Sequence, residues 1–448
     1  MKRKTQTNRR GFLKQTGAAA GASLAFSAPS IVPRSVLAQT PPSEKLNVGF
    51  IGLGWRGIQL MQGAMRNDNI HISAICDLDL PFLLHARQIL DDHYVVDREE
   101  IVGRGGGMKR AENPENAVDT YLDYRHMIER DDLDGILIAV PDHWHAKTYN
   151  DSMKAGKDVY GEKPLSLTIQ QGRAIADCAQ KEGRIFQTGS QQRSADEFWK
   201  ACSYARSGRI GKISHVTVGI GGAPQTEPVP NEPVPPGLNW DMWLGPAPYY
   251  EYNPLRMHVT FRWFFDYSGG MVTDWGAHHL DIAQWGLGQD LSGPVKVEGY
   301  GNTKPGFYTT FTEFQFKFTY DDGVTVDFGN GFRGGVTFHG EKGEIWCNRG
   351  QLESTIEGLF DEPLTDGDVQ LYKSNNHMQD WVDCVKTRTQ PICNPEIGHR
   401  SATVCHLANI CGWEGRPLEW DPVSETFPGD PAANKHLDRD PRFPWSYL

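Results

Sequence analysis

Apolar runs separated by helical segments fill the first part of the chain. Residues 45–51, 70–76 and 135–140 are such runs, and a shorter one lies at 158–160. Nearly continuous apolar strands that alternate with helices are typical of a parallel sheet covered on both faces. The pattern predicts an α/β domain with a doubly wound parallel sheet over residues 46–168.

Strict alternation of apolar and polar residues marks the later part of the chain. It occurs at 216–220 and 314–320, and Asp322-Gly323 then leads into a third alternating run at 324–328. A period of two is typical of strands with one buried face, and Asp-Gly between such runs indicates a hairpin. We therefore expect a second α/β domain over 169–448 that contains an open, mainly antiparallel sheet.

A proline-rich segment at 224–254, which carries Trp240 and Trp243, interrupts this second pattern. Proline lacks the amide donor that a central strand needs, so we expect a structured covering loop there. Further helices are expected around Trp381 and Leu407. These last helices can pack back on the first domain.

The first 38 residues differ in composition from the rest. They hold seven basic residues and no acidic residue, and their apolar run at 17–28 is too short to span a bilayer. Arg9-Arg10, followed by Gly-Phe-Leu-Lys, resembles a twin-arginine export signal. We expect 1–38 to be a cleaved signal peptide and 39–45 an N-terminal arm. The twin-arginine export machinery is then an expected partner. The protein is expected in the periplasm or otherwise exported, without stable insertion into the membrane. An ordinary secretion signal or a basic tail is the alternative.

Charge and cysteine content narrow the possible functions. The formal net charge is −11, and it falls to −18 once the seven basic residues of the leader are set aside. Such an acidic body repels phosphate backbones, so no nucleic acid partner is expected. The eight cysteines are widely spaced without a Cys-x-x-Cys pair, which fits no zinc or iron–sulfur site.

Three glycines after the first predicted strand have the spacing of a dinucleotide-binding loop. Gly52, Gly54 and Gly57 form Gly-x-Gly-x-x-Gly, which allows a tight turn, close approach of a pyrophosphate and close packing of helix on strand. Asp77 ends the second strand, where a carboxylate accepts hydrogen bonds from a ribose and repels a 2′-phosphate. The first domain is therefore expected to be a Rossmann domain that binds NAD, with NADP possible.

Two polar loops follow the later strands of this domain. They are Pro141 to His145 and Gly161-Glu162-Lys163-Pro164. Ligands of doubly wound sheets bind beyond the carboxyl ends of the strands, so both loops should face the cofactor. His143 and His145 could share a strand face as metal ligands, but no third ligand follows at a useful spacing, and no metal site is expected.

Asp274 and His278 form a second candidate for chemistry. Four residues apart on a helix, they would share a face. A carboxylate beside an imidazole orients the ring and raises its pKa. Such a pair could take the proton of a substrate hydroxyl while hydride leaves the same carbon.

These motifs, in this order, resemble the Gfo/Idh/MocA oxidoreductases, a family that includes glucose–fructose oxidoreductase and inositol dehydrogenase. The resemblance implies a Rossmann domain followed by an α/β domain whose open sheet often forms the subunit interface, and hence a homo-oligomer, a dimer or tetramer. It implies that Lys163, Asp274 and His278 are catalytic. The positions that it places along the nucleotide are Gly52, Gly54, Asp77, Pro141, His143 and Glu162. Further candidates for cofactor binding in the same loops are Leu53, Trp55, Arg56, His145 and Lys163. The candidate substrate contacts are Arg193, Trp243, Arg262, Trp263 and His279.

The expected function is that of an exported oxidoreductase with tightly bound NAD(H). It would oxidise or reduce a secondary hydroxyl of a sugar, glycoside or polyol by hydride transfer. One alternative is an NAD-dependent glycosidase that acts by transient oxidation and elimination. Another is a noncatalytic sensor of sugar or nucleotide.

Overall fold

A computed structural model describes residues 44–101 and 118–448 of the chain, with the side chains of 95–101 left out. The predicted signal peptide (1–38) and most of the predicted arm (39–45) lie outside the described residues. All eight cysteines lie within them, and each is a buried free thiol.

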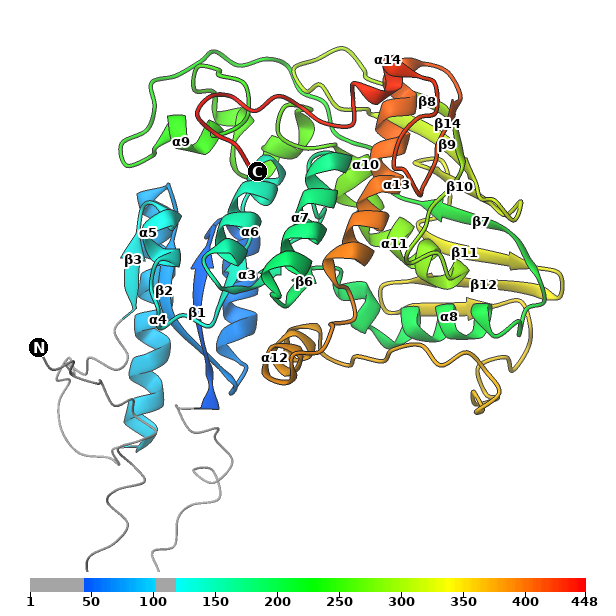
Figure 1. The fold of residues 1–448 in the computed structure, drawn as a ribbon, viewed down its shortest axis with the longest axis horizontal. Coiled ribbons are helices and arrows are strands. Elements are labelled where there is room, and N and C mark those ends of the chain that lie inside the picture. Colours follow the sequence, from blue (N-terminus) through cyan, green and yellow to red (C-terminus); the bar gives the residue numbers. More distant parts are fainter. Residues whose placement is uncertain (1–43, 102–117) are drawn as a thin grey trace, which may run out of the picture. The chain divides into compact units, whose positions relative to one another are not determined.

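Six parallel strands form the first sheet, in the order β3-β2-β1-β4-β5-β6. The strands are β1 (Leu46–Ile51), β2 (Ile70–Cys76), β3 (Asp119–Tyr121), β4 (Gly135–Ile138), β5 (Asp158–Gly161) and β6 (Phe186–Thr188). The helices are α3 (Trp55–Met65), α4 (Leu80–Ile101), α5 (Tyr124–Ile128), α6 (His145–Lys154) and α7 (Ile169–Glu182), with a 3-10 turn η3 (Asp142–Trp144). Figure 1 shows α6 and α7 side by side against this sheet. The prediction of a doubly wound parallel sheet is confirmed, and its strand order reverses between β1 and β4, where such folds bind ligands.

The first sheet extends past residue 168, where the sequence placed the end of the domain. The hydroxyl of Thr168 accepts the amide of Gln171 at 3.3 Å and so caps the N-terminus of α7. After α7 the chain returns to the sheet as β6, which pairs with β5 in parallel. Residue 168 is therefore a helix cap inside the first domain.

Eight strands form the second sheet, in the order β13-β12-β11-β7-β10-β9-β8-β14. They are β7 (Ile213–Gly219), β8 (Lys296–Asn302), β9 (Glu313–Thr319), β10 (Thr325–Gly329), β11 (Gly335–Gly340), β12 (Gly343–Asn348), β13 (Gln351–Ser354) and β14 (Leu418–Glu419). Only β7 and β10 pair in parallel among these neighbours. The predicted hairpin joins β9 to β10, and the expectation of a mainly antiparallel sheet is confirmed.

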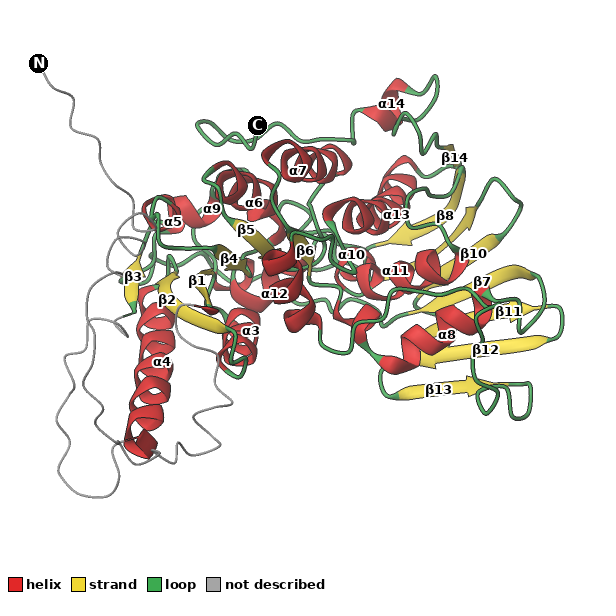
Figure 2. Cartoon of the chain, turned by 60° about the horizontal axis from the view of Figure 1, so that its bottom comes forward, coloured by secondary structure: helices red, strands yellow, loops and turns green. Residues whose placement is uncertain are grey.

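Helices cover one face of this second sheet. Further elements of this half of the chain are η4 (Gln191–Ser194), α8 (Asp196–Arg206), α9 (Trp240–Leu244), η5 (Pro254–Arg256), η6 (His258–Trp263), α10 (Met271–Asp274), α11 (Gly276–Leu287), α12 (His377–Thr387), α13 (Pro395–Glu414) and α14 (Pro431–Asn434). Figure 2 shows α8 and α11 lying over the strands, and their apolar side chains share a core with Phe314, Phe316 and Phe318. The alternate residues of β9, Gln315 and Lys317, are exposed on the other face.

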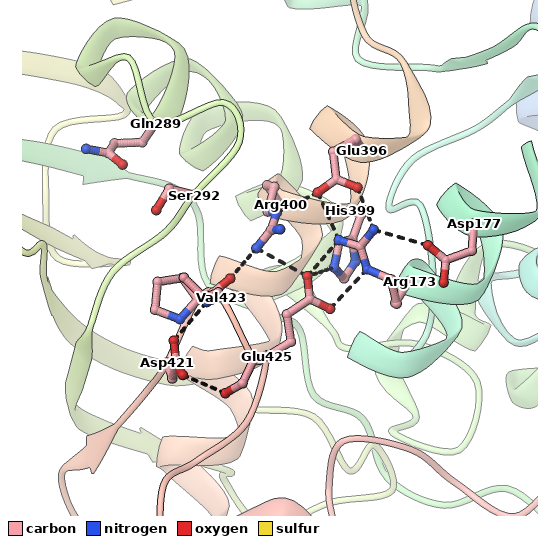
Figure 3. Close-up of polar contacts among 12 residues, drawn as sticks. Arg173, Asp177, Gln289, Ser292, Glu396, His399, Arg400, Asp421, Val423 and Glu425 are labelled. Atoms are coloured by element: carbon pink, nitrogen blue, oxygen red, sulfur yellow. Dashed lines mark hydrogen bonds and ion pairs between the residues drawn. The ribbon is translucent and has the colours of Figure 1, made fainter. Parts of the chain in front are cut away.

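The last long helices also pack on the first domain. Trp381 of α12 is fully buried in the core beneath the first sheet, against Gly135 of β4. Charged groups join α13 to α7: Arg173 contacts Glu396 at 2.6 Å and Glu425 at 2.7 Å, and His399 contacts the same Glu425 carboxylate at 2.9 Å (Figure 3). The two domains therefore share both apolar and ionic contacts.

The proline-rich segment crosses to the loop that follows β2. Gly237 accepts the amide of Leu80 at 3.0 Å, and the amide of Asn239 donates to Leu78 at 3.1 Å. Beyond this crossing, α9 carries Trp240 and Trp243 into an aromatic cluster with Tyr252, Phe264 and Tyr267. The segment is thus a structured cover, as expected, and its tip is attached to the first domain.

Candidate active site

The carboxyl ends of the first sheet face a cavity of about 1150 Å³. Its lining comes from the loops after β1, β2, β4 and β5, and from η6, α10, α11 and the β12–β13 turn of the second domain. Small-molecule sites usually enclose about 300–1,000 Å³. The cavity is therefore large enough for a cofactor together with a substrate.

The glycine loop after β1 has the geometry that a pyrophosphate needs. Gly52 has φ +86°, and a Cβ there would lie 2.6 Å from the carbonyl oxygen of Ala139. A Cβ on Gly57 would lie 2.0 Å from the carbonyl oxygen of Gly52, so α3 can pack on β1 only with glycine at this position. Gly54 has no atom within 4 Å of its Cβ position, which leaves the approach to the N-terminus of α3 open. Trp55 lines the cavity and is exposed, whereas Leu53 is buried beneath the loop.

Asp77 lies at the end of β2 and orders the glycine loop. Its carboxylate accepts the amides of Leu53 at 2.5 Å and Asp79 at 2.8 Å. Burial raises the pKa of Asp77 to about 6, although these two hydrogen bonds act in the opposite direction. Each carboxylate oxygen keeps a lone pair for a ribose hydroxyl. Asp79 lines the cavity as well, so two carboxyl groups lie where the ribose would bind and disfavour a 2′-phosphate. The residues present therefore fit NAD.

Glu162 and Arg56 join the loop after β5 to helix α3. Arg56 donates to one carboxylate oxygen of Glu162 from Nη2 at 2.7 Å and from Nε at 3.0 Å. Gln191 donates to the same oxygen at 3.1 Å. Arg56 and Glu162 both line the cavity, and their ion pair fixes the loop after β5 against helix α3 there.

Lys163 and Asp274 bring the two domains together at the cavity. The ammonium group of Lys163 lies 2.7 Å from the carboxylate of Asp274, and Arg262 lies 3.2 Å from the same oxygen. Burial alone would raise the pKa of Asp274, but the charges of Lys163 and Arg262 outweigh it and lower the pKa. Asp274 is therefore a stable carboxylate between two cations.

His278 lies in the same cavity wall, at the start of α11. Its Nδ1 is buried and has no hydrogen bond partner among the described residues. Burial, followed by the charges of Lys163 and Arg349, holds the pKa of His278 well below its ordinary value. The imidazole is thus neutral at physiological pH and has capacity to exchange a proton.

The expected Asp274–His278 pair is not formed, and the expectation that Asp274 raises the pKa of His278 is wrong. The prediction assumed one continuous helix, but α10 ends at Asp274 and α11 begins at Gly276. Asp274 directs its carboxylate to Lys163 and Arg262. Burial is the main cause that lowers the pKa of His278, and the charges of Lys163 and Arg349 act in the same direction.

The two histidines of the loop after β4 lie behind the cavity wall. His143 is buried against Trp243 and Tyr267, with Nε2 2.9 Å from the carbonyl oxygen of Trp243. The ring nitrogens of His145 lie 2.7 Å from the carbonyl oxygen of Pro164 and 3.0 Å from that of Val140. Neither side chain lines the cavity, and their contacts support the surrounding loops, whereas Pro141 does line the cavity.

The candidate substrate contacts divide into two groups. Trp243, Arg262 and Trp263 line the cavity. Arg193 does not: it is almost fully buried and pairs with Asp281 at 2.7 Å and Asp290 at 2.8 Å, as a buried guanidinium requires.

His279 also lies outside the cavity lining. It is buried beside Gln192, with Nδ1 3.3 Å from the amide nitrogen of that residue. Burial lowers its pKa to about 4. Adjacent residues of a helix point in different directions, which separates His279 from His278.

The cavity lining also contains residues that the sequence motifs did not select, among them Gln191, Trp275 and Arg349. Gln191 follows β6, so the rule that ligands bind beyond strand ends could have found it. Arg349 lies in the turn between β12 and β13, and no motif marks it. Its guanidinium carbon lies 4.6 Å from the centre of the Trp275 ring.

Within residues 44–101 and 118–448, no group of three or more His, Cys, Asp or Glu side chains is arranged to hold a metal ion. No helix in the same ranges has the length and hydrophobicity that crossing a membrane requires.

Comparison with known families assigns both domains. Residues 46–190 match the NAD-binding Rossmann fold of the Gfo/Idh/MocA oxidoreductase family, and residues 223–447 match the C-terminal alpha/beta domain of that family. The first domain is therefore an NAD-binding Rossmann domain.

Curated relatives align with part of the chain. An alpha-N-acetylgalactosaminidase of Shewanella oneidensis is 30% identical over 224 residues, which are 46% of this chain and 44% of that protein. A glycosyl hydrolase family 109 protein of Shewanella sp. strain MR-4 is 29% identical over 222 residues, with the same shares of 46% and 44%. The chain thus spans less than half the length of the curated relatives that it matches.

Solved structures share the two-domain fold over most of this chain. The WlbA dehydrogenase of Bordetella pertussis, in complex with NADH and UDP-GlcNAcA, has a TM-score of 0.60 at 16% identity, over 84% of this chain and 99% of that chain. The aldose-aldose oxidoreductase of Caulobacter crescentus, complexed with glycerol, has a TM-score of 0.58 at 19% identity, again over 84% and 99%. At these identities the likeness establishes the two-domain fold.

Proposed function

Because the chain belongs to the Gfo/Idh/MocA oxidoreductase family, we propose that it oxidises a secondary hydroxyl of a sugar, glycoside or polyol with bound NAD. The observation that carries this proposal is the neutral His278 beside the Lys163–Asp274 pair, at the cavity onto which the glycine loop opens. The same arrangement serves the reverse reduction.

The residues of the site supply the proton chemistry of this reaction. When bound, NAD supplies the hydride acceptor. Neutral His278 acts as the base that takes the hydroxyl proton, and the ammonium group of Lys163 donates a hydrogen bond to the substrate oxygen as negative charge develops there. Asp274 holds the ammonium group of Lys163 in place through the 2.7 Å contact.

Aromatic side chains in the cavity favour a carbohydrate as the substrate. Trp243, Phe261 and Trp263 line it together with Arg262. Aromatic rings pack against the apolar C–H face of a sugar ring, while the charged groups bind its hydroxyls. The glycerol and UDP-sugar complexes of the structural neighbours are consistent with this substrate class.

A carbohydrate panel tests the proposal. NAD-loaded protein would be mixed with sugars, glycosides and polyols while nicotinamide absorbance is followed, and the products would be identified by mass spectrometry. Reduction of bound NAD together with a keto product supports oxidoreduction. Sugar binding without any change in absorbance would instead indicate the noncatalytic sensor.

A second candidate is an NAD-dependent glycosidase, favoured by the glycosidase names of the curated relatives. Transient oxidation of a hydroxyl acidifies the neighbouring C–H bond, which permits elimination of the glycosidic substituent. Water then adds to the resulting double bond, and the hydride is returned from the reduced cofactor to the ketone. Incubation with nitrophenyl glycosides separates the two candidates. Release of nitrophenol without net oxidation of the sugar supports the glycosidase.

Export and retention of the cofactor belong to the same proposal. We propose that residues 1–38 direct the folded protein to the periplasm through the twin-arginine machinery, with NAD bound before export, because free cofactor should be scarce outside the cytoplasm. Fractionation of cells that produce the Arg9→Lys/Arg10→Lys double variant tests the route, since that variant should stay in the cytoplasm. Nucleotide extracted from mature protein purified without added NAD tests retention.

Assembly completes the proposal. The open face of the second sheet, which exposes Gln315 and Lys317, is proposed to take part in a homo-oligomer interface. Light scattering of the purified protein measures the stoichiometry, and a monomer would contradict the proposal.

A further inference from the structure

Arg349 differs from the other cationic side chains of the cavity. Among the lysines and arginines that the structure places in the lining, Arg56 pairs with Glu162, and Lys163 and Arg262 share Asp274. Arg349 lines the same cavity, and no carboxylate of the described residues pairs with it. Arg349 is exposed and has no ion-pair partner among the described residues, and the Asp274 carboxylate acts on it only from beyond ion-pair distance.

Neutral groups nevertheless hold the guanidinium of Arg349 in a defined orientation. It stacks on the indole of Trp275 at 4.6 Å, and its Nε and Nη2 each donate to the amide oxygen of Gln192 at 3.3 Å. Glu197, which also lines the cavity, accepts the backbone amide of Gly350 at 2.8 Å instead of the guanidinium. The N–H groups of Nη1 donate no hydrogen bond to a described residue, so this side of the guanidinium group can bind a ligand.

The position of Arg349 relates it to the reacting end of the cavity. Its charge acts on His278 and lowers the pKa of that imidazole. Asp274 acts on the Arg349 guanidinium through its charge but forms its ion pairs with Lys163 and Arg262. An arginine keeps its charge at all physiological pH values, and its planar fork suits oxyanions.

We propose that Arg349 binds an anionic substituent of the substrate, a carboxylate or a sulfate, so that the protein acts on acidic carbohydrates. This inference rests on the proposed function and specifies the substrate class of that site. A neutral hydroxyl would leave the charge of Arg349 unmatched, whereas an oxyanion forms charge-assisted hydrogen bonds with it.

Binding measurements with matched sugar pairs test the inference. NAD-loaded protein would be titrated calorimetrically with glucose against glucuronate, galactose against galacturonate, and N-acetylglucosamine against its 6-sulfate. We expect the acidic member of at least one pair to bind about tenfold more tightly or better, in the range of one charge-assisted contact. The uronates and the sulfate distinguish the two possible anions.

Two variants assign the preference to this side chain. Arg349→Gln should abolish the preference for the acidic sugar. Arg333→Gln is the matched control, because Arg333 also stacks on a tryptophan, at 3.3 Å from the centre of the Trp346 ring, but pairs with Glu353 and lies outside the cavity lining. It removes the same charge and should leave the preference intact.

Three results would overturn the inference. The first is that no acidic sugar of the panel binds more tightly than its neutral counterpart. The second is that Arg349→Gln, folded and loaded with NAD, keeps the preference. The third is that Arg349→Gln loses bound NAD but still prefers the acidic sugar. The arginine would then bind the cofactor and not the substrate. Tight binding of an acidic sugar without any nicotinamide reduction would contradict the proposed reaction while leaving this assignment standing.

Discussion

The ammonium group of Lys163 donates to both the backbone carbonyl and the carboxylate of Asp274, at 2.8 and 2.7 Å. Within α11, the amide of His278 bonds to the carbonyl of Trp275 at 3.0 Å, and the Asp274 carbonyl is left to the lysine. The loop after β5 is thereby attached to the junction of α10 and α11. Groups from the two domains form one unit beside the cavity.

Replacing Lys163 with Met removes the cationic donor at this junction. We expect turnover to fall by about 10²–10³-fold, the usual effect of losing one donor to a developing oxyanion. NAD should remain bound, since the glycine loop and Asp77 hold the other end of the cofactor. Single-turnover rate, bound nucleotide and melting temperature would be measured on one sample. A folded, NAD-loaded variant with a normal rate would contradict the role of Lys163.

His278→Asn tests the proposed base. The chemical step should slow by about 10²–10⁴-fold, the range of general acid–base catalysis, with NAD still bound. The neighbouring His279→Asn is the control: His279 is buried beside Gln192, outside the cavity lining, so its folded fraction should keep a near-normal rate. Equal losses of rate in both variants would point to a structural effect.

The pH dependence of oxidation should report the lowered pKa of His278. Only the neutral imidazole accepts a proton, and burial and the charges of Lys163 and Arg349 lower its pKa. The rate should therefore persist to pH values below the ordinary imidazole pKa of about 6.5 and fall only at more acidic pH. Arg349→Gln removes one of these cations, which favours the imidazolium, so the acid limb of the pH–rate profile should move to higher pH. A limb that stays in place would separate Arg349 from the titration.

Asp77→Ala should weaken the discrimination between NAD and NADP. The carboxylate at the end of β2 opposes a 2′-phosphate, and alanine removes that charge together with the acceptor for Leu53 and Asp79. Equilibrium dialysis with both nucleotides would show a lower NAD to NADP affinity ratio. If wild-type protein carries mainly NADP after purification, the assignment of Asp77 as the group that selects NAD is wrong. Arg56 would then be the expected partner of the 2′-phosphate, and its guanidinium would have to leave Glu162.

The ionic network between α7 and α13 should make stability depend on pH (Figure 3). Burial would raise the pKa of Glu425, but hydrogen bonds from His399 and Arg173 lower it from 4.5 to about 2. A carboxylate with a lowered pKa stabilises the fold above its unfolded pKa, and this contribution is lost as pH falls through the folded pKa. The loss should occur between about pH 5 and pH 2.

Glu425→Gln tests this network by urea unfolding. At pH 7 the variant should lower the free energy of unfolding by on the order of 2 kcal/mol. Breaking a fully buried ion pair costs about 3–5 kcal/mol, and the loss is smaller here because Arg173 retains Glu396 as a partner. Near pH 2 the difference from wild type should vanish. Glu353→Gln, at the exposed pair with Arg333, should cost no more than about 0.5 kcal/mol. A pH-independent effect of Glu425→Gln would contradict the ionic explanation.

Local sequence rules determined both sheets and the cofactor end of the site. Continuous apolar runs and alternating runs are distinct patterns, so the parallel strands β1, β2, β4 and β5 and the β9–β10 hairpin could be predicted from neighbouring residues alone, whereas the three-residue strands β3 and β6 were too short to show a pattern. The glycine loop was equally accessible, because positive φ at Gly52 and close packing at Gly57 are requirements of a few adjacent atoms.

Tertiary structure decided the partners of the charged groups. Asp274 and His278 are four residues apart, yet Lys163, 111 residues away in the chain, takes the Asp274 carboxylate. Arg193 was expected in the cavity but is neutralised by Asp281 and Asp290, and Arg349 enters the cavity from a turn that carries no motif. Electrostatic pairing depends on distance and burial across the folded chain, whereas the hydrophobic period depends on residues that are consecutive. The sequence thus determined the main strands of both sheets and the cofactor loop, and only folding decided which charges pair with one another and which remain unpaired.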